Sequence, residues 1–117
     1  MTKGQIEAQI SEAIIKFEKE YMGRGPVETR TFIIEDLIIV RLKGVLTPAE
    51  EQLTKTKDGA ELIKRTRALL IEEGKTLLSD MINKITGIKV VSLHTDVSTK
   101  TGERIIVFTL EKKYEVL

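Results

Sequence analysis

The stretch from residue 47 to residue 87 constrains the fold more than any other part of the chain. Its apolar residues recur mostly at intervals of three, four and seven, which is the pattern of one face of an α-helix. The helix is expected to start at Thr47. Thr47 and Glu50 can together cap the first turn, and Pro48 suits the first helical position. Gly87 marks the stop, since glycine readily adopts the left-handed conformation that ends many helices.

One unbroken helix over this stretch would be about 60 Å long at 1.5 Å per residue, roughly twice the width of a small domain. Residues 55–59, Lys-Thr-Lys-Asp-Gly, are its weakest helical part because they include two threonines and a glycine. We therefore expect a break or bend there, followed by a main helix from about residue 60 to residue 86. Gly74 is a second position at which we expect the helix to be weak.

Residues 5–21 predict another amphipathic helix near the start of the chain. Apolar side chains recur there every three or four positions, from Ile6 to Tyr21, and charged side chains fill the other side. Gly23, Gly25 and Pro26 end this helix, because two glycines and a proline within four residues make a continued helix costly.

A β-hairpin is expected after the first helix. Residues 27–34 and 37–43 are rich in β-branched and apolar residues, which is typical of two antiparallel strands. Glu35 and Asp36 at the tip lack the glycine that two-residue turns favour, so we expect a longer or bulged loop. Asp36 is interpreted as a turn former rather than a catalyst.

A second hairpin is expected from residues 88–97 and 103–115, which are joined by a polar loop that ends in glycine. One face of its second strand carries Ile106, Phe108 and Leu110, and the other face carries Ile105, Val107 and Thr109. Apolar residues on both faces indicate that both sides of the sheet are at least partly covered.

The order helix, hairpin, helix, hairpin predicts the fold class. We expect residues 1–117 to form a single α+β domain with the two-layer order α-β-β-α-β-β, four mainly antiparallel strands, helices on one face and a long second helix. One helix layer covers only one side of such a sheet and leaves apolar surface bare. We therefore predict a homodimer that forms through the long helix or through the outer face of the sheet.

Composition excludes several classes of function. Lysine and arginine total 19 against 18 acidic residues, so the net charge of +1 gives no general attraction to nucleic acids. The 4% of aromatic residues includes no tryptophan, so no base-stacking platform is predicted. The absence of cysteine excludes disulfides and thiolate metal sites. Without an apolar run of transmembrane length or a signal peptide, the protein is expected to be cytoplasmic.

Residues 23–26, Gly-Arg-Gly-Pro, are the most unusual local sequence, and they follow Tyr21 closely. Glycines let a ligand or another chain approach the backbone, and the guanidinium of Arg24 can hold a carboxylate or phosphate with two nitrogens. The 21–26 corner is therefore a candidate binding site for an anion or a partner. The alternative is a sharp helix-to-strand turn in which these residues only steer the backbone. The run matches neither a Walker motif nor a Rossmann fingerprint.

His94 and Asp96 form the second candidate site. His94 is the single histidine, and a strand would place Asp96 on the same face two residues later. A carboxylate beside an imidazole can make a general base or half of a metal site. The alternative is a pair of polar sheet residues without a catalytic duty. We assign no catalytic residue, no metal site and no cofactor, because one histidine without cysteines does not build a standard zinc centre.

Arg65 and Arg67 lie within the long helix. If either arginine falls on the apolar side, it would be a buried ligand or partner contact, since an unpaired guanidinium is costly there. The alternative is a solvated charged face.

The order of these landmarks resembles a known family. The run Tyr-Met-Gly-Arg-Gly-Pro at 21–26 precedes Gly-Val-Leu-Thr at 44–47, and Arg67, Asp96 and Val-Phe-Thr-Leu at 107–110 continue the likeness. Over nearly its whole length the chain resembles a small bacterial family, long a domain of unknown function. That family is named for the C component of a Na+-translocating membrane-potential-generating system. The resemblance implies a soluble accessory of a sodium or bicarbonate uptake system and assigns no catalytic residue.

Two functions follow from these observations. The first is a non-enzymatic accessory or regulatory module that dimerises and contacts a partner protein, such as a membrane complex, through the 21–26 corner. The second is a domain that binds a small anion or metabolite, or a minor enzyme, in which Arg24, Arg67, His94 and Asp96 converge on a pocket.

Overall fold

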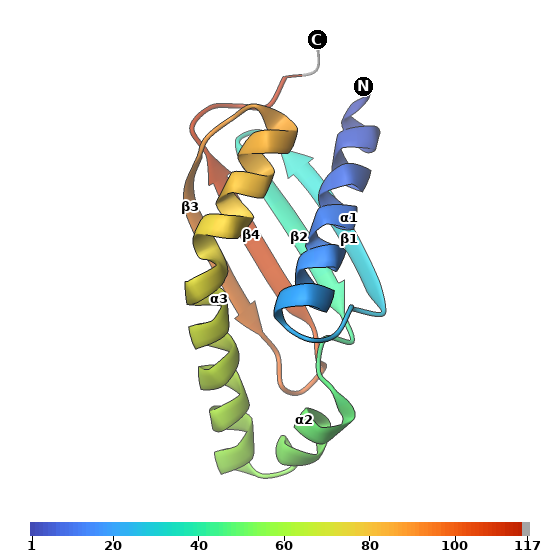
Figure 1. The fold of residues 1–117 in the computed structure, drawn as a ribbon, viewed down its shortest axis with the longest axis vertical. Coiled ribbons are helices and arrows are strands. Elements are labelled where there is room, and N and C mark those ends of the chain that lie inside the picture. Colours follow the sequence, from blue (N-terminus) through green and yellow to red (C-terminus); the bar gives the residue numbers. More distant parts are fainter. Residues whose placement is uncertain (116–117) are drawn as a thin grey trace.

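Residues 1–115 are described by the computed structural model (Figure 1). They form α1 (Lys3–Tyr21), β1 (Glu28–Ile34), β2 (Leu37–Lys43), α2 (Pro48–Leu53), α3 (Lys57–Thr86), β3 (Val90–Val97) and β4 (Arg104–Leu110). Neighbouring strands are antiparallel, and their order across the sheet is β1-β2-β4-β3. In Figure 1, α1 and α3 lie on the same face of this sheet, with α1 over β1 and α3 over β3. The predicted two-layer α+β class is therefore confirmed.

The predicted capping signals place the helix ends. Thr47 and Glu50 form the capping box of α2, and Pro48 occupies its first turn. Gly87 ends α3 in the left-handed conformation, with φ of 74°, and its N–H donates to the carbonyl of Asn83.

The break in the 47–87 stretch is present, but it lies earlier than expected. Residues 54–56 separate α2 from α3, whereas the main helix was expected to begin near Ala60. The hydroxyl of Thr56 accepts the N–H of Gly59 and so caps α3 before the glycine. A Cβ at Gly59 would overlap the carbonyl oxygen of Leu53. The glycine is therefore where α2 packs against the first turn of α3, and it does not interrupt the helix.

Gly74 also lies inside α3, where α3 passes α1. A Cβ at this position would lie 2.9 Å from Cζ of Phe17 and 3.3 Å from Cε1 of Tyr21. The rings of Phe17 and Tyr21 are stacked with their centroids 4.9 Å apart. Gly74 therefore serves close helix packing.

The tip of the first hairpin is tighter than expected. Ile34 pairs with Leu37, so Glu35 and Asp36 form a two-residue turn without a longer loop or bulge. Glu35 takes a positive φ of 57° in place of the usual glycine. The interruption of register lies elsewhere, in β3 between Val90 and Ser92.

The second hairpin has the predicted alternation but shorter strands. Its second strand ends at Leu110 rather than near residue 115, because the chain then turns away. The N–H of Tyr114 donates to the carbonyl of Glu35 at the other hairpin tip, and Tyr114 packs against the core.

The core lies between the sheet and the two long helices. Buried side chains of the sheet include Ile38, Val40, Leu42, Ile106 and Phe108, and those of the helices include Ile10, Ile14, Ile71, Leu78 and Ile82. Among the helices of residues 1–115, none combines the length and apolarity required to cross a bilayer.

Candidate functional site

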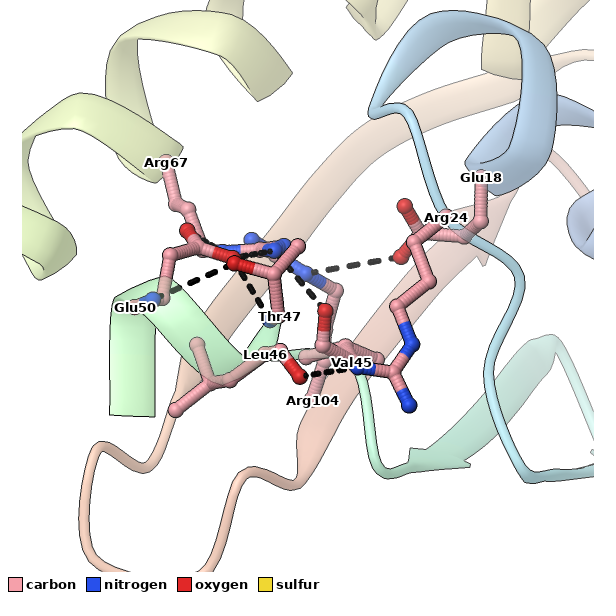
Figure 2. A network of polar contacts seen from close by, with 8 residues as sticks. All are labelled: Glu18, Arg24, Val45, Leu46, Thr47, Glu50, Arg67 and Arg104. Atoms are coloured by element: carbon pink, nitrogen blue, oxygen red, sulfur yellow. Dashed lines mark hydrogen bonds and ion pairs between the residues drawn. The ribbon is translucent and has the colours of Figure 1, made fainter. Parts of the chain in front are cut away.

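The 21–26 corner is fastened to the segment that leads into α2. Gly23 has a φ of 93°, which turns the chain at the end of α1. The backbone N–H of Arg24 donates to the carbonyl of Glu18, and its Nη1 donates to the carbonyl of Leu46 at 2.8 Å (Figure 2). A Cβ at Gly25 would lie 2.8 Å from Cε of Lys19, so the glycine allows close passage of that side chain. One guanidinium nitrogen of Arg24 is thus engaged in a hydrogen bond within the protein.

Arg67 is buried, with 3% of the residue exposed, and links α3 to the start of α2. Its Nε and Nη2 donate to the two carboxylate oxygens of Glu50 at 2.9 and 2.7 Å. Nη2 also donates to the carbonyl of Val45 at 2.8 Å (Figure 2). Glu50 in turn accepts the backbone N–H of Thr47. A two-pronged arginine–carboxylate contact of this kind fixes orientation, and here it fixes how α2 sits on α3.

A second buried pair, Glu18 and Arg104, completes this group of charges. Each residue is 1% exposed, and Arg104 Nε lies 3.8 Å from Glu18 Oε1. The Nη1 of Arg104 donates to the hydroxyl of Thr95. Within residues 1–115, both Glu18 oxygens, Nε and Nη2 of Arg104 and Nη1 of Arg67 are buried without a hydrogen-bond partner. We call Glu18, Arg24, Glu50, Arg67 and Arg104 the charge network.

Burial decides the electrostatics of the network. Desolvation raises the pKa of Glu18, although the positive charges of Arg104 and Arg67 oppose it. Desolvation also lowers the pKa of Arg104, against the attraction of Glu18. For Glu50, burial works toward a higher pKa, but hydrogen bonds from Arg67 and Thr47 and the charge of Arg67 lower it overall. Glu50 is therefore an ionised partner of Arg67, whereas Glu18 takes up a proton more readily than Glu50 does.

The sequence contains a signal for Glu18 and Arg104 in the periodicity of α1 and β4. Glu18 follows Ile14 by four residues on the apolar face of α1. Arg104 precedes Ile106 by two residues and Phe108 by four, so the alternation of side chains along the strand places it on the same inner face. A basic and an acidic residue at predicted core positions would have identified the pair.

The structure brings Arg24 and Arg67 to adjacent carbonyl groups, those of Leu46 and Val45. His94 and Asp96 lie outside the charge network, on exposed positions of the edge strand β3. One Asp96 oxygen accepts the N–H of Val97 and the other lies 3.3 Å from Nζ of Lys64. Both oxygens of Asp96 are thus engaged by groups other than the imidazole of His94.

Tyr21 lines a groove of about 390 Å³ between α1 and α3. The groove is lined by Ala13, Lys16, Phe17, Glu20, Tyr21, Leu77 and Met81. Its walls are mostly apolar, with Lys16 and Glu20 as the charged side chains of the set. We call this the helix groove, and it leads to the 21–26 corner.

Metal ligands do not gather in the part of the chain that the structure describes. Residues 1–115 contain no group of three or more histidine, aspartate or glutamate side chains that could hold an ion.

These features define a class of protein: a two-layer α+β domain with an antiparallel four-stranded sheet, an internal charge network and an apolar groove between its helices. The chain belongs to the MpsC family, described as "Na+-translocating membrane potential-generating system (MpsC)", whose family model matches residues 2–112. The resemblance inferred from the sequence is therefore confirmed.

Two proteins of Bacillus subtilis (strain 168) are similar to this chain. The uncharacterized protein YbcI is 53% identical over 109 residues, which cover 93% of this chain and 88% of YbcI. The uncharacterized protein YrhF is 25% identical over 108 residues, which cover 92% of this chain and 88% of YrhF. No solved structure matches the chain.

Proposed function

We propose that this protein is a non-enzymatic accessory module of a Na+-translocating membrane-potential-generating system. In this proposal it is a cytoplasmic homodimer that reaches the membrane through a partner protein. The family description supports the link to the membrane system. One observation carries the proposal. The charged candidate residues Arg67 and Asp96 bind other side chains of this protein, Glu50 and Lys64, whereas large apolar side chains remain exposed at the surface.

The helix groove and the 21–26 corner are the proposed partner-binding site. The stacked rings of Phe17 and Tyr21 give the groove a rigid apolar floor, since Gly74 lets α3 approach them closely. The groove suits an apolar side chain of a partner protein, with charged groups of that partner beside Lys16 and Glu20.

Membrane potential in living cells tests this function. A bacterial strain that lacks the gene is complemented with wild type or with Leu77→Glu, which places a charge in the helix groove. Leu62→Glu is the matched control, because Leu62 has a similar exposure on the same helix, 44% against 48% for Leu77. We expect wild type and the control to restore a Na+-dependent potential, measured with a voltage-sensitive dye, and Leu77→Glu to fail at equal protein level. An unchanged potential in the deletion strain would refute the accessory role.

Anion binding is a second candidate function, and one observation favours it. Arg67 Nη1 and two nitrogens of Arg104 are buried without hydrogen-bond partners in the described residues. Guanidinium groups in such a setting can take a small anion such as bicarbonate or phosphate. Thermal unfolding with each salt, and with sodium chloride at equal ionic strength, tests this function. Stabilisation of the wild type by bicarbonate or phosphate that is lost in the double variant Glu18→Leu and Arg104→Leu would favour it, and equal melting temperatures would exclude it.

A further inference from the structure

The outer face of the sheet, which points away from α1 and α3, carries an ordered pattern of side chains. Strand register aligns Phe32, Ile39, Val107 and His94 in one row across the sheet. These residues alternate with buried neighbours along β1, β2 and β4 and with a buried and a half-buried neighbour on β3, and Phe32 is 39% exposed. The middle of the outer face is therefore apolar and no helix of residues 1–115 lies on it (Figure 1).

A neighbouring row of the outer face has a charge at each end. Register places Arg30 on β1, Arg41 on β2, Ile105 on β4 and Asp96 on β3 in line. Arg41 is paired with Glu103 at 2.8 Å within the subunit. Arg30 lies over the ring of Phe32, 5.6 Å from its centroid, and Asp96 has a side chain that is 76% exposed. Asp96 also lies 3.3 Å from Nζ of Lys64 of its own subunit. One edge of the row thus carries an arginine, and the opposite edge carries an exposed carboxylate that shares its charge with a lysine.

We propose that the outer face binds a second copy of this chain, related by a two-fold axis that runs parallel to the strands between β2 and β4. This inference rests on the proposed function in one respect, the homodimer, and adds the surface, the symmetry and the residues that meet. The dimer places β1 of one subunit over β3 of the other, so that Arg30 faces Asp96 of the partner subunit twice.

The symmetry follows from the pattern of rows. A two-fold axis parallel to the strands exchanges the two edges of the sheet but keeps each residue at its level along the strand. Phe32 then meets His94 of the partner subunit, and Ile39 meets Val107 of the partner subunit. An in-plane axis perpendicular to the strands would instead place β1 over β1 and leave Arg30 without an acid at its level. Packed sheets cross at about 30°, which shifts the edges by roughly one residue, and the long arginine side chain spans that offset.

The size of the outer face allows a small interface. Strands about 4.8 Å apart and about seven residues long at 3.4 Å per residue cover roughly 450 Å² in projection, and side-chain relief adds accessible area. The projected area is little more than half of the roughly 800 Å² per partner that is usual for a stable interface, so the dimer would have a small interface. An apolar centre with charges at the rim is also the usual composition of a specific interface.

Charge reversal tests the inference in the full chain. Sedimentation equilibrium measures the dimer dissociation constant for wild type, Arg30→Asp, Asp96→Arg and the double variant. Each single variant sets like charges against each other at two symmetric places, and we expect it to weaken the dimer by about tenfold or more. The double variant restores opposite charges and should return to within about threefold of the wild type. Within one subunit, two strands separate Arg30 from Asp96, so rescue requires the second copy.

Two further variants separate the competing results. Phe32→Glu, at an exposed position of the apolar row, should give a monomer with the circular dichroism of the wild type. Leu69→Glu, on the exposed side of α3, should leave the dimer intact. If the dimer persists in Arg30→Asp, Asp96→Arg and Phe32→Glu but is lost in Leu69→Glu, the proposed interface is wrong. The proposed homodimer itself would remain valid. A wild-type monomer at the highest concentration reached would overturn both, and would leave the membrane-potential test of the accessory role unaffected.

Discussion

The two faces of the sheet use the same strands for different purposes. On the inner face, Val40, Ile106 and Phe108 are fully buried under the helices. On the outer face, their direct neighbours Ile39 and Val107 remain partly exposed. Ionic contacts differ in the same way, since Glu18 and Arg104 are sealed inside whereas Lys64 and Asp96 meet at the surface. The comparison indicates that the inner face determines stability, and we infer that the outer face determines association.

The largest expected contrast is between Phe108→Ala and Val107→Ala. Removing the buried ring leaves a cavity, so Phe108→Ala should lower the free energy of unfolding by about 3–5 kcal/mol. Val107→Ala should cost about 1 kcal/mol or less in the monomer, because its side chain is already partly in water. Urea unfolding at two protein concentrations separates lost packing from lost association. Equal losses in the two variants would refute the division of roles between the faces.

The buried ion pair of the inner face gives the next largest effect. Arg104→Leu leaves the carboxyl of Glu18 in the core without its partner, and we expect a loss of about 3 kcal/mol. The double variant Glu18→Leu and Arg104→Leu removes both charges. Its free energy of unfolding should lie within about 1 kcal/mol of the wild-type value or above it. Urea unfolding of the wild type, Glu18→Leu, Arg104→Leu and the double variant forms a double-mutant cycle. Additive losses would show that the two side chains act independently.

The pH dependence of stability should also distinguish the inner carboxyls. Because the folded-state pKa of Glu18 is raised, the folded state holds its proton longer, and stability falls as pH rises from about 4.5 toward that pKa. Glu18→Gln should remove this decline, so its stability relative to the wild type should grow with pH. Glu50 has a lowered pKa, so the stability it contributes is lost as pH falls below about 4.5, and Glu50→Gln is the matched control. Urea midpoints across this range measure both slopes, and parallel curves for Glu18→Gln and wild type would contradict the prediction.

The smallest effect is expected for the ion pair at the surface. Lys64 and Asp96 lie 3.3 Å apart, and both side chains are well exposed. Lys64→Ala should therefore change the free energy of unfolding by about 0.5 kcal/mol or less. The same urea assay at low and high salt checks this value. A loss comparable to that of Arg104→Leu would erase the contrast between the surface pair and the buried pair.

Local signals were sufficient for most of the fold. Capping residues such as Thr47 and Gly87 depend on neighbours in the chain, so the sequence predicts the helix ends. Alternation along residues 104–110 likewise predicts which side chains are buried. The hairpin tip was misjudged because Glu35 adopts a positive φ that the paired strands on both sides impose.

The candidate site was harder to predict, because its contacts join distant segments. Arg67 was recognised as a candidate for burial, but its partner Glu50 was assigned only to a helix cap, and the residue serves both purposes. Glu18 and Arg104 meet only when the end of α1 comes close to the start of β4, and that requires the strand order β1-β2-β4-β3. A periodic pattern reports which side of an element is buried, but it does not report which elements meet.

The central position of the β2–β4 ladder has a consequence for how the molecule assembles. Leu37 pairs with Thr109, and Leu42 pairs with Arg104, so the middle of the sheet joins the hairpin β1–β2 to the hairpin β3–β4. Each hairpin can form locally in microseconds, whereas the central ladder must wait for a long loop to close. Until then both β2 and β4 expose unpaired backbone groups. In a newly synthesised chain, the sheet therefore stays open along its middle until β4 has left the ribosome.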